Sequence, residues 1–138
     1  MKDLRVWGLK KSPWVYHLAA ASCNNCDIEI LELLTPRYDV ERFGAVLVGS
    51  PRHADALLVT GVINRKSLPR VLEVYEQTPK PCLVIAIGTC ACNCHIFRNS
   101  YNAVGPYDKY IPVNAYIPGC PPKPEAMIMG IVKALSKL

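Results

Sequence analysis

The sequence predicts a small α/β fold built on an open, mostly parallel sheet with helices on both faces. Short apolar runs alternate along the chain with segments of helical periodicity, which is typical of parallel strands joined by helices. The run 82–87 is apolar throughout, without polar alternation, which indicates a strand buried on both faces. The length of 138 residues suits a single domain of ordinary size.

The first thirteen residues are expected to form an N-terminal arm, residues 1–13, ahead of the single domain 14–138. The arm holds four basic side chains against the single acid Asp3. We interpret it either as a solvated extension or as a docking arm for a partner subunit.

The first half of the domain contains a predicted strand at 14–20 and a predicted helix at 26–34, which ends at a Thr-Pro pair. Short strands are predicted at 45–49 and 56–60. The six residues between these two strands are too few for a helical crossover. The strand 45–49 is therefore either an edge strand or half of an antiparallel hairpin.

In the second half, Ser67 is expected to cap a helix over 67–77. Strands are predicted at 82–87 and 113–117. The segment 124–138 has apolar residues at the i, i+3, i+4, i+7 spacing and is the clearest helix. The expected architecture is a small open sheet similar to that of flavodoxin.

Composition excludes several classes of protein. A content of 51% apolar and 20% charged residues excludes extended disorder. No apolar run approaches the roughly 20 residues of a membrane span, and the basic start of the chain lacks the apolar stretch of a signal peptide. The net charge of +5 comes without a Lys/Arg cluster, so nucleic-acid binding is not expected. We expect a cytosolic chain that reaches a membrane only through partners.

The seven cysteines are the strongest chemical signal in the sequence. An odd number without a secretion signal argues against a disulfide framework and for thiolates as metal ligands. Cys23 and Cys26 form a C-x2-C motif after the first predicted strand, and Cys90 and Cys120 each follow a later strand. Because ligands bind at the carboxyl ends of strands in an open parallel sheet, these four cysteines are predicted to converge on one edge.

Four converging thiolates suit either Zn²⁺ or an iron–sulfur cluster. Structural zinc usually takes two closely spaced cysteine pairs, whereas only one pair is close here, which favours iron and sulfide. Gly88, Gly119 and Asn24-Asn25 are expected to let backbone N–H groups approach the sulfides. A zinc-stabilised interaction module, unliganded thiols and a flavodoxin-like FMN protein remain alternatives, although a Ser/Thr/Gly phosphate loop is missing after the first strand.

The other three cysteines have separate interpretations. Cys82 lies in the buried-strand pattern and is expected to be a packed thiol. Cys92 and Cys94 form C-x-C-H with His95. We expect these two thiols to lie beside the cluster, and the alternative is that they are ligands themselves.

Charged residues offer further candidates near the site. Arg52 and His53 follow the strand 45–49. Arg52 is a candidate donor of hydrogen bonds to the cluster pocket or to a partner subunit, and His53 a candidate for coupling proton uptake to reduction. The alternatives are an arginine that ties down loop carbonyls and an exposed histidine. Asp27 and Glu29 are expected to interact with the dipole of their helix.

Four segments, in a fixed order, resemble one protein family: Cys23-Asn-Asn-Cys-Asp-Ile-Glu-Ile, Gly49-Ser-Pro-Arg-His-Ala-Asp, Gly88-Thr-Cys-Ala-Cys and Tyr116-Ile-Pro-Gly-Cys-Pro-Pro-Lys-Pro-Glu. The family is the small iron–sulfur subunit of membrane-bound, energy-converting [NiFe]-hydrogenases. It is homologous to the 20 kDa subunit of respiratory NADH:quinone oxidoreductase that carries cluster N2. The resemblance covers nearly the whole of residues 14–138.

The resemblance implies that Cys23, Cys26, Cys90 and Cys120 bind one proximal [4Fe–4S] cluster that faces a large catalytic subunit. Electrons would pass from ferredoxin, through clusters on a neighbouring ferredoxin-type subunit, to this cluster and then to the large subunit. Membrane-arm subunits would hold the chain at the cytoplasmic side of the membrane and couple electron transfer to ion movement. No bond chemistry is expected from this chain alone.

Two departures from the family pattern leave the type of complex open. Asn25 stands where hydrogenase-type subunits usually have glycine, and Asn93-Cys94-His95 stands where they usually have Ser-Gly-Gly. Both lie beside the expected cluster. The C-x2-C spacing resembles the hydrogenase branch, and the alternative is a quinone or sulfane-sulfur reductase without nickel.

Overall fold

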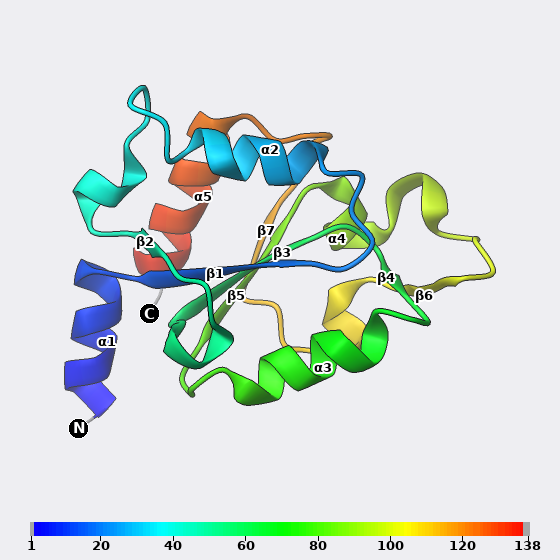
Figure 1. Cartoon of the computed structure of the whole chain (residues 1–138), viewed down its shortest axis with the longest axis horizontal. Helices are drawn as coiled ribbons and strands as arrows, with labels where there is room; N and C mark the ends of the chain where they lie inside the picture. Colours follow the sequence, from blue (N-terminus) through cyan, green and yellow to red (C-terminus); the bar gives the residue numbers. More distant parts are fainter. Residues whose placement is uncertain (1, 137–138) are drawn as a thin grey trace.

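The computed structural model describes residues 2–136, and its centre is a five-stranded parallel sheet (Figure 1). The strands are, in chain order, β1 (Trp14–Ala19), β2 (Val46–Leu47), β3 (Ala56–Thr60), β5 (Leu83–Ile87) and β7 (Ala115–Ile117). They lie in the order β2-β1-β3-β5-β7, and each neighbouring pair is parallel. The predicted parallel sheet is therefore confirmed.

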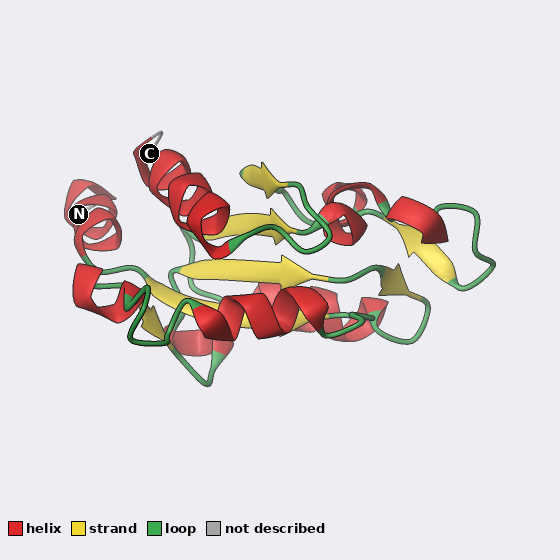
Figure 2. Ribbon diagram, turned by 90° about the horizontal axis from the view of Figure 1, so that it is seen from above, coloured by secondary structure: helices red, strands yellow, loops and turns green. Residues whose placement is uncertain are grey.

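Helices cover both faces of this sheet (Figures 1 and 2). The α-helices are α1 (Lys2–Lys11), α2 (Asn25–Glu32), α3 (Leu68–Gln77), α4 (Thr89–Asn93) and α5 (Pro124–Ser136). Helices α2 and α5 pack on one face and α3 on the other. Four short 3-10 helices join them: η1 (Val40–Phe43), η2 (Pro51–His53), η3 (His95–Phe97) and η4 (Tyr107–Lys109).

The two central strands explain why their sequences show no polar alternation. In β3, Leu57 and Val59 pack on the side of α3, while Ala56 and Leu58 pack on the side of α2 and α5. Strand β5 divides its side chains between the two faces in the same way. Because both faces are covered by helices, every position of these strands is buried, as the run 82–87 predicted.

Strand β2 settles the ambiguity over residues 45–49. It pairs in parallel with β1 at the edge of the sheet, so it is an edge strand and not half of a hairpin. The connection from β2 to β3 contains only the single turn η2. This short connection is long enough because β2 has only two residues, so the chain needs to travel only a short way back to the start of β3.

Several local features differ from the sequence-based expectations. The segment expected as an arm forms helix α1, whose Leu9 is buried and which contacts α5. The Ser67 side chain does not cap α3, because its hydroxyl bonds to the backbone of Asn64 instead. An antiparallel pair, β4 (Ile63–Asn64) with β6 (Ala103–Gly105), was not predicted, nor was α4.

The parallel sheet has two different ends. The strands β1, β3, β5 and β7 all run toward the end where α4 and the pair β4–β6 lie, on the right of Figure 1. We call this end the carboxyl edge and the other end the amino edge. The last helix is described to Ser136, so the remainder of the predicted helix 124–138 lies outside the described residues. None of the described helices is long and apolar enough to cross a membrane.

Candidate functional site

Four cysteines from three separate segments, which follow β1, β5 and β7, meet at the carboxyl edge. Cys23 lies in the loop after β1, Cys26 in the first turn of α2, Cys90 in α4 after β5, and Cys120 in the loop after β7. All four line one cavity of about 160 Å³. The structure thus brings together the four residues that the sequence singled out, while their role as ligands remains a prediction.

A left-handed turn places the first two cysteines. Asn24 has φ of +68°, and its backbone N–H donates to Ser22 Oγ at 3.1 Å. Asparagine is among the few residues that adopt this conformation readily. Asn25, where relatives of the hydrogenase type usually have glycine, is already the first residue of α2 and lines the cavity. The position therefore does not require the conformational freedom of glycine.

Gly88 makes room for a thiol. It has φ of +87°, and a Cβ at this position would lie only 2.6 Å from Cys26 Sγ. Its N–H donates to the carbonyl of Ile117 at 2.9 Å. The glycine is needed for close approach to the Cys26 thiol, and its own N–H is already bonded to Ile117.

A compact set of hydrogen bonds ties the loop of Cys120 to α4. The Thr89 backbone N–H and hydroxyl both donate to the Gly119 carbonyl, at 2.8 and 3.0 Å. The Gly119 N–H donates in turn to Thr89 Oγ1 at 3.2 Å. These bonds fix the spacing between Cys90 and Cys120. The Gly119 N–H, which was expected to approach a sulfide, is thus bonded to Thr89. In the same way, the Asn24 N–H is bonded to Ser22.

The remaining cysteines lie outside the cavity lining. Cys92 lies within α4, its Sγ is 3.7 Å from the Ala86 carbonyl oxygen, and burial raises the pKa of its thiol to about 11. Cys94 is 2% exposed and adopts φ of +65°. Burial raises the pKa of Cys94, and the nearby cations Lys109 and Arg98 oppose this shift. Both thiols are therefore close to Cys90 in the chain but do not line the cavity. This favours the interpretation that Cys92 and Cys94 lie beside the cluster over the interpretation that they are ligands.

Cys82 lies at the amino edge, just before β5. It is partly buried against the core on the α3 side, and its Sγ is 3.4 Å from Lys80 Nζ. This agrees with the expectation of a packed thiol away from the other cysteines.

Arg52 and His53 are not brought to the cysteine cavity. Both lie in η2, which precedes β3 and contacts α3, and both are exposed. Neither lines the cavity, which lies beyond the opposite ends of the strands. The expectation that they adjoin the four cysteines is therefore wrong in this structure, because the turn joining β2 to β3 lies toward the amino edge.

The thiols of the cavity influence one another electrostatically. Burial raises the pKa of Cys26 to about 11, with smaller contributions from Cys23, Asp27, Cys90 and Cys120. Burial also raises the pKa of Cys90, with contributions from Cys120, Cys23 and Cys94. Burial therefore disfavours the thiolate form of Cys26 and Cys90, so binding of iron or zinc to them releases protons.

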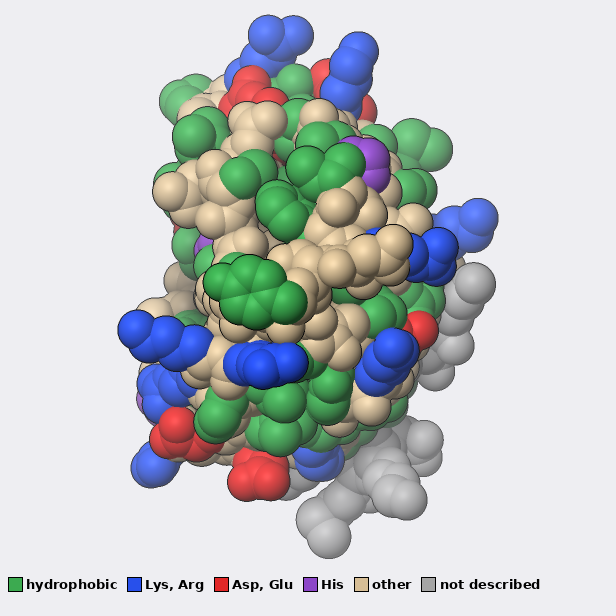
Figure 3. Space-filling view, turned by 90° about the vertical axis from the view of Figure 1, so that its right-hand side faces the viewer, with side chains coloured by type: hydrophobic (Ala, Val, Ile, Leu, Met, Phe, Trp, Pro, Cys, Tyr) green, Lys and Arg blue, Asp and Glu red, His purple; other side chains and the backbone are tan. Residues whose placement is uncertain are grey.

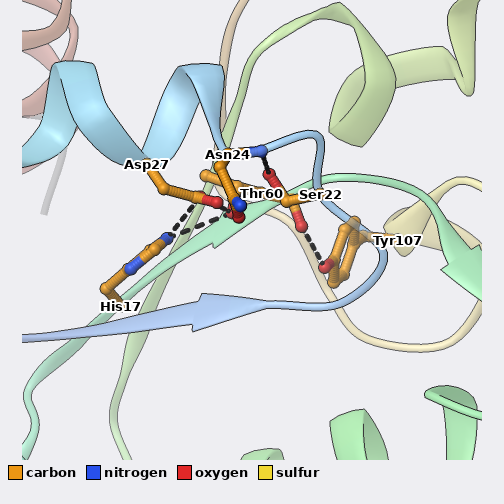
Figure 4. A network of polar contacts seen from close by, with 6 residues as sticks. All are labelled: His17, Ser22, Asn24, Asp27, Thr60 and Tyr107. Carbon is orange, nitrogen blue, oxygen red and sulfur yellow. Dashed lines mark hydrogen bonds and ion pairs between the residues drawn. The ribbon is translucent and has the colours of Figure 1, made fainter.

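A polar network that the sequence did not reveal lies under the first turn of α2 (Figure 4). Asp27 Oδ1 accepts a hydrogen bond from Thr60 Oγ1 at 2.5 Å and lies 2.9 Å from His17 Nε2. His17 Nε2 is also 3.1 Å from Thr60 Oγ1. Asp27 was expected only to interact with the helix dipole. The alternation of β1, which places His17 on the same face as α2, was the available signal.

The surface around the cavity carries apolar side chains. Figure 3 views this end of the molecule, where hydrophobic side chains lie among uncharged surface, with a few Lys or Arg side chains between them. Phe97 lines the cavity and is 44% exposed, and its neighbour Ile96 is 77% exposed. An apolar surface around a cavity is typical of a protein interface.

The donor set can be tested against the two metal alternatives. Within residues 2–136, no group of three or more His, Cys, Asp or Glu side chains is placed to hold a single metal ion. The four thiols instead stand around a cavity. A cubane cluster takes one thiolate at each of its irons, so its ligands surround it without meeting at a point. Four thiolates around one cavity are a donor set that suits an iron–sulfur cluster.

Comparison with known proteins gives one family match. The family model described as "NADH ubiquinone oxidoreductase, 20 Kd subunit" matches residues 23–134, a range that contains all four cysteines of the cavity. The resemblance indicated by the four sequence segments is thereby confirmed.

Individual relatives come from several kinds of complex. The chain is 59% identical over 93% of its length to the probable membrane-bound hydrogenase subunit mbhJ of Pyrococcus furiosus, and covers 77% of that protein. It is 40% identical over 96% of its length to a subunit of the NADH-quinone oxidoreductase of Geotalea daltonii, and covers 75% of that subunit.

Among solved structures, a chain of the membrane-bound sulfane sulfur reductase, an archaeal respiratory membrane complex, is similar with a TM-score of 0.85. It is 44% identical, and the match covers 99% of the present chain and 75% of the other.

Proposed function

The chain belongs to the family of the 20 Kd subunit of NADH ubiquinone oxidoreductase, and we propose that it is an electron-transfer subunit that carries one [4Fe–4S] cluster. Members of this family bind an iron–sulfur cluster. We assign the ligands of this chain to Cys23, Cys26, Cys90 and Cys120. The observation that carries the proposal is that these four thiols, from the segments after β1, β5 and β7, line one cavity.

When bound, such a cluster supplies one-electron transfer and breaks no substrate bond. The residues of this chain would hold the cluster between the protein core and the surface. Cys26 and Cys90 are partly buried, whereas Cys23 and Cys120 are exposed. One side of the cavity is therefore backed by the protein core, and the other opens to the surface. Electrons enter and leave most directly through the open side.

The open side is where we propose that a large catalytic subunit of the hydrogenase type binds. The exposed apolar residues Phe97 and Ile96 beside the cavity support a protein partner there. We also propose that electrons arrive from ferredoxin through a ferredoxin-type subunit, and that membrane-arm subunits hold the chain at the cytoplasmic side. Two of the relatives named above belong to membrane-bound complexes, which supports attachment through partners.

Two kinds of complex suit this subunit, and each is favoured by one comparison. The relative with 59% identity is a probable hydrogenase subunit, whose partner would contain nickel. The similar solved structure is a sulfane sulfur reductase. Cys94 and His95 stand where hydrogenase-type subunits usually have glycines, which makes the second alternative worth testing directly.

The proposal is tested on the native complex, purified anaerobically through a tag on this chain. We expect iron and acid-labile sulfide, together with an electron paramagnetic resonance (EPR) signal that appears on reduction with ferredoxin and disappears when the terminal acceptor is added. Nickel identifies a hydrogenase, and its absence identifies the sulfur- or quinone-reducing type. Zinc without sulfide would refute the electron-transfer function.

A further inference from the structure

We propose that His17, Asp27 and Thr60 form a positioning network that fixes the Cys23–Cys26 segment relative to the sheet and thereby sets the environment of the cluster. This inference rests on the proposed function, because it assigns a role toward the group held by these cysteines. The three residues are positioning residues, since Asp27 acts through its neighbour Cys26.

The network joins three elements at a single carboxylate oxygen. Asp27 lies in the first turn of α2, Thr60 is the last residue of β3, and His17 lies in β1. Thr60 Oγ1 and His17 Nε2 lie 2.5 and 2.9 Å from Asp27 Oδ1. Because a carboxylate only accepts hydrogen bonds, both partners donate to it. Bonds to a charged acceptor away from bulk water are among the strongest in proteins, and the Asp27 side chain is 14% exposed.

The network acts at the start of α2, which has no side-chain cap of its own. The residue before the helix, Asn24, caps it with no side-chain hydrogen bond. Cys23 and Asn24 are exposed. Asp27 directly follows Cys26, so a carboxylate held against β1 and β3 also fixes the direction in which the Cys26 thiol points, toward Gly88.

Thr60 is itself held from the other side of the sheet. Its carbonyl accepts a hydrogen bond from the buried Tyr107 hydroxyl at 2.9 Å (Figure 4). Tyr107 belongs to η4, which packs with the core on the α3 side. Thr60 is therefore bonded both to α2 on one face of the sheet and to Tyr107 on the α3 side, and its side chain is fully buried.

The test uses Thr60→Val, which keeps the shape of the side chain and removes its hydroxyl. Thr60→Ser restores the hydroxyl. The matched control is Thr78→Val, which also removes a buried threonine hydroxyl, one that bonds to Val74 at the end of α3. Each variant complex is purified anaerobically, and two properties are measured: the EPR spectrum of the reduced cluster and the rate at which iron is lost to a chelator.

We expect Thr60→Val to lose iron roughly tenfold faster than the parental complex, as for other residues that orient metal ligands, with a changed EPR spectrum. Thr60→Ser should match the parental complex, and Thr78→Val should lower only the thermal midpoint. If the Thr60→Val complex does not assemble, the Asp27→Asn complex replaces it, and its EPR spectrum and rate of iron loss are expected to change in the same way.

The outcomes separate this inference from the proposed function. A parental complex with a cluster, combined with a Thr60→Val complex whose spectrum and iron loss match those of Thr78→Val, overturns the positioning role alone. A parental complex without iron and sulfide overturns the proposed function and the positioning role together.

Discussion

Strand β5 separates two cysteines that differ only in where they stand. Cys82 precedes the strand and Cys90 follows it. At the amino edge, Cys82 is packed against core residues with Lys80 beside it. At the carboxyl edge, Cys90 joins three other cysteines around a cavity. Position relative to the strand ends, and not residue type, therefore decides which thiols can act together.

The two edges also differ in what their loops present. The carboxyl edge uses the positive φ of Gly88 and Gly119 together with side-chain hydrogen bonds from Thr89 and Thr60. At the amino edge the turn η2 leaves Arg52 and His53 exposed. We therefore expect substitutions at the carboxyl edge to affect the cluster and substitutions at the amino edge to leave it intact.

The largest effect is expected from the cysteines themselves. Cys90→Ser or Cys120→Ser should abolish the cluster signal of this chain, because a hydroxyl is a poor substitute for a thiolate ligand. Cys82→Ser should keep the signal. The iron content and the EPR spectrum of each anaerobically purified variant complex test these expectations. Loss of iron in Cys82→Ser beside an intact Cys120→Ser would reverse the assignment of the two edges.

The next largest effect is expected at Gly88. Gly88→Ala places a Cβ 2.6 Å from Cys26 Sγ at φ of +87°, so it should cost about 2 kcal/mol or more of stability and displace Cys26. Thermal unfolding and iron content of the complex provide the measurement. Gly49→Ala is the control, because a Cβ there meets nothing within 4 Å. Equal behaviour of the two variants would show that the cavity needs no close approach at Gly88.

A smaller, favourable effect is expected at His95, an exposed residue with φ of +42°. His95→Gly should stabilise the protein by up to about 1 kcal/mol, because glycine adopts this conformation without a steric cost. His95→Ala, which keeps a Cβ, is the control. A thermal midpoint for His95→Gly no higher than that for His95→Ala would contradict the steric cost at this φ, because the two variants differ only in the Cβ.

A pH effect smaller than these is expected where α5 begins. The backbone N–H of Glu125 and the hydroxyl of Tyr38, 2.8 Å from Oε1, lower the pKa of the Glu125 carboxyl. Since the folded pKa lies below the unfolded one, the stabilisation is present above the unfolded value and is lost as pH falls through the folded value. Tyr38→Phe should therefore weaken the protein slightly at neutral pH and less in acid. Thermal midpoints across this pH range test it, and a difference that grows in acid would contradict the sign.

The smallest effect is expected at the amino edge. Arg52→Ala and His53→Ala should change stability by no more than about 0.5 kcal/mol and leave the EPR spectrum of the cluster unchanged. A changed spectrum in either variant would mean that this turn reaches the cluster in the assembled complex.

Much of the architecture follows from local sequence patterns. The continuous apolar run at β5 predicted a strand buried on both faces, and the positions of Cys23, Cys26, Cys90 and Cys120 just after predicted strands indicated that they meet at one edge. Arg52 and His53 were placed wrongly because a two-residue strand gives no sequence signal of where its loop turns back. The bond between Asp27 and Thr60 depends on the packing of α2 over β3, which no local pattern contains.

The cluster assignment is tested most directly by a crystal structure of the anaerobically purified complex with anomalous data collected at the iron edge. We predict one cubane cluster in the cavity at the carboxyl edge, with its irons bonded to Sγ of Cys23, Cys26, Cys90 and Cys120. A single zinc ion at these thiols, or iron bonded to Cys92 or Cys94 in place of one of them, would contradict this prediction.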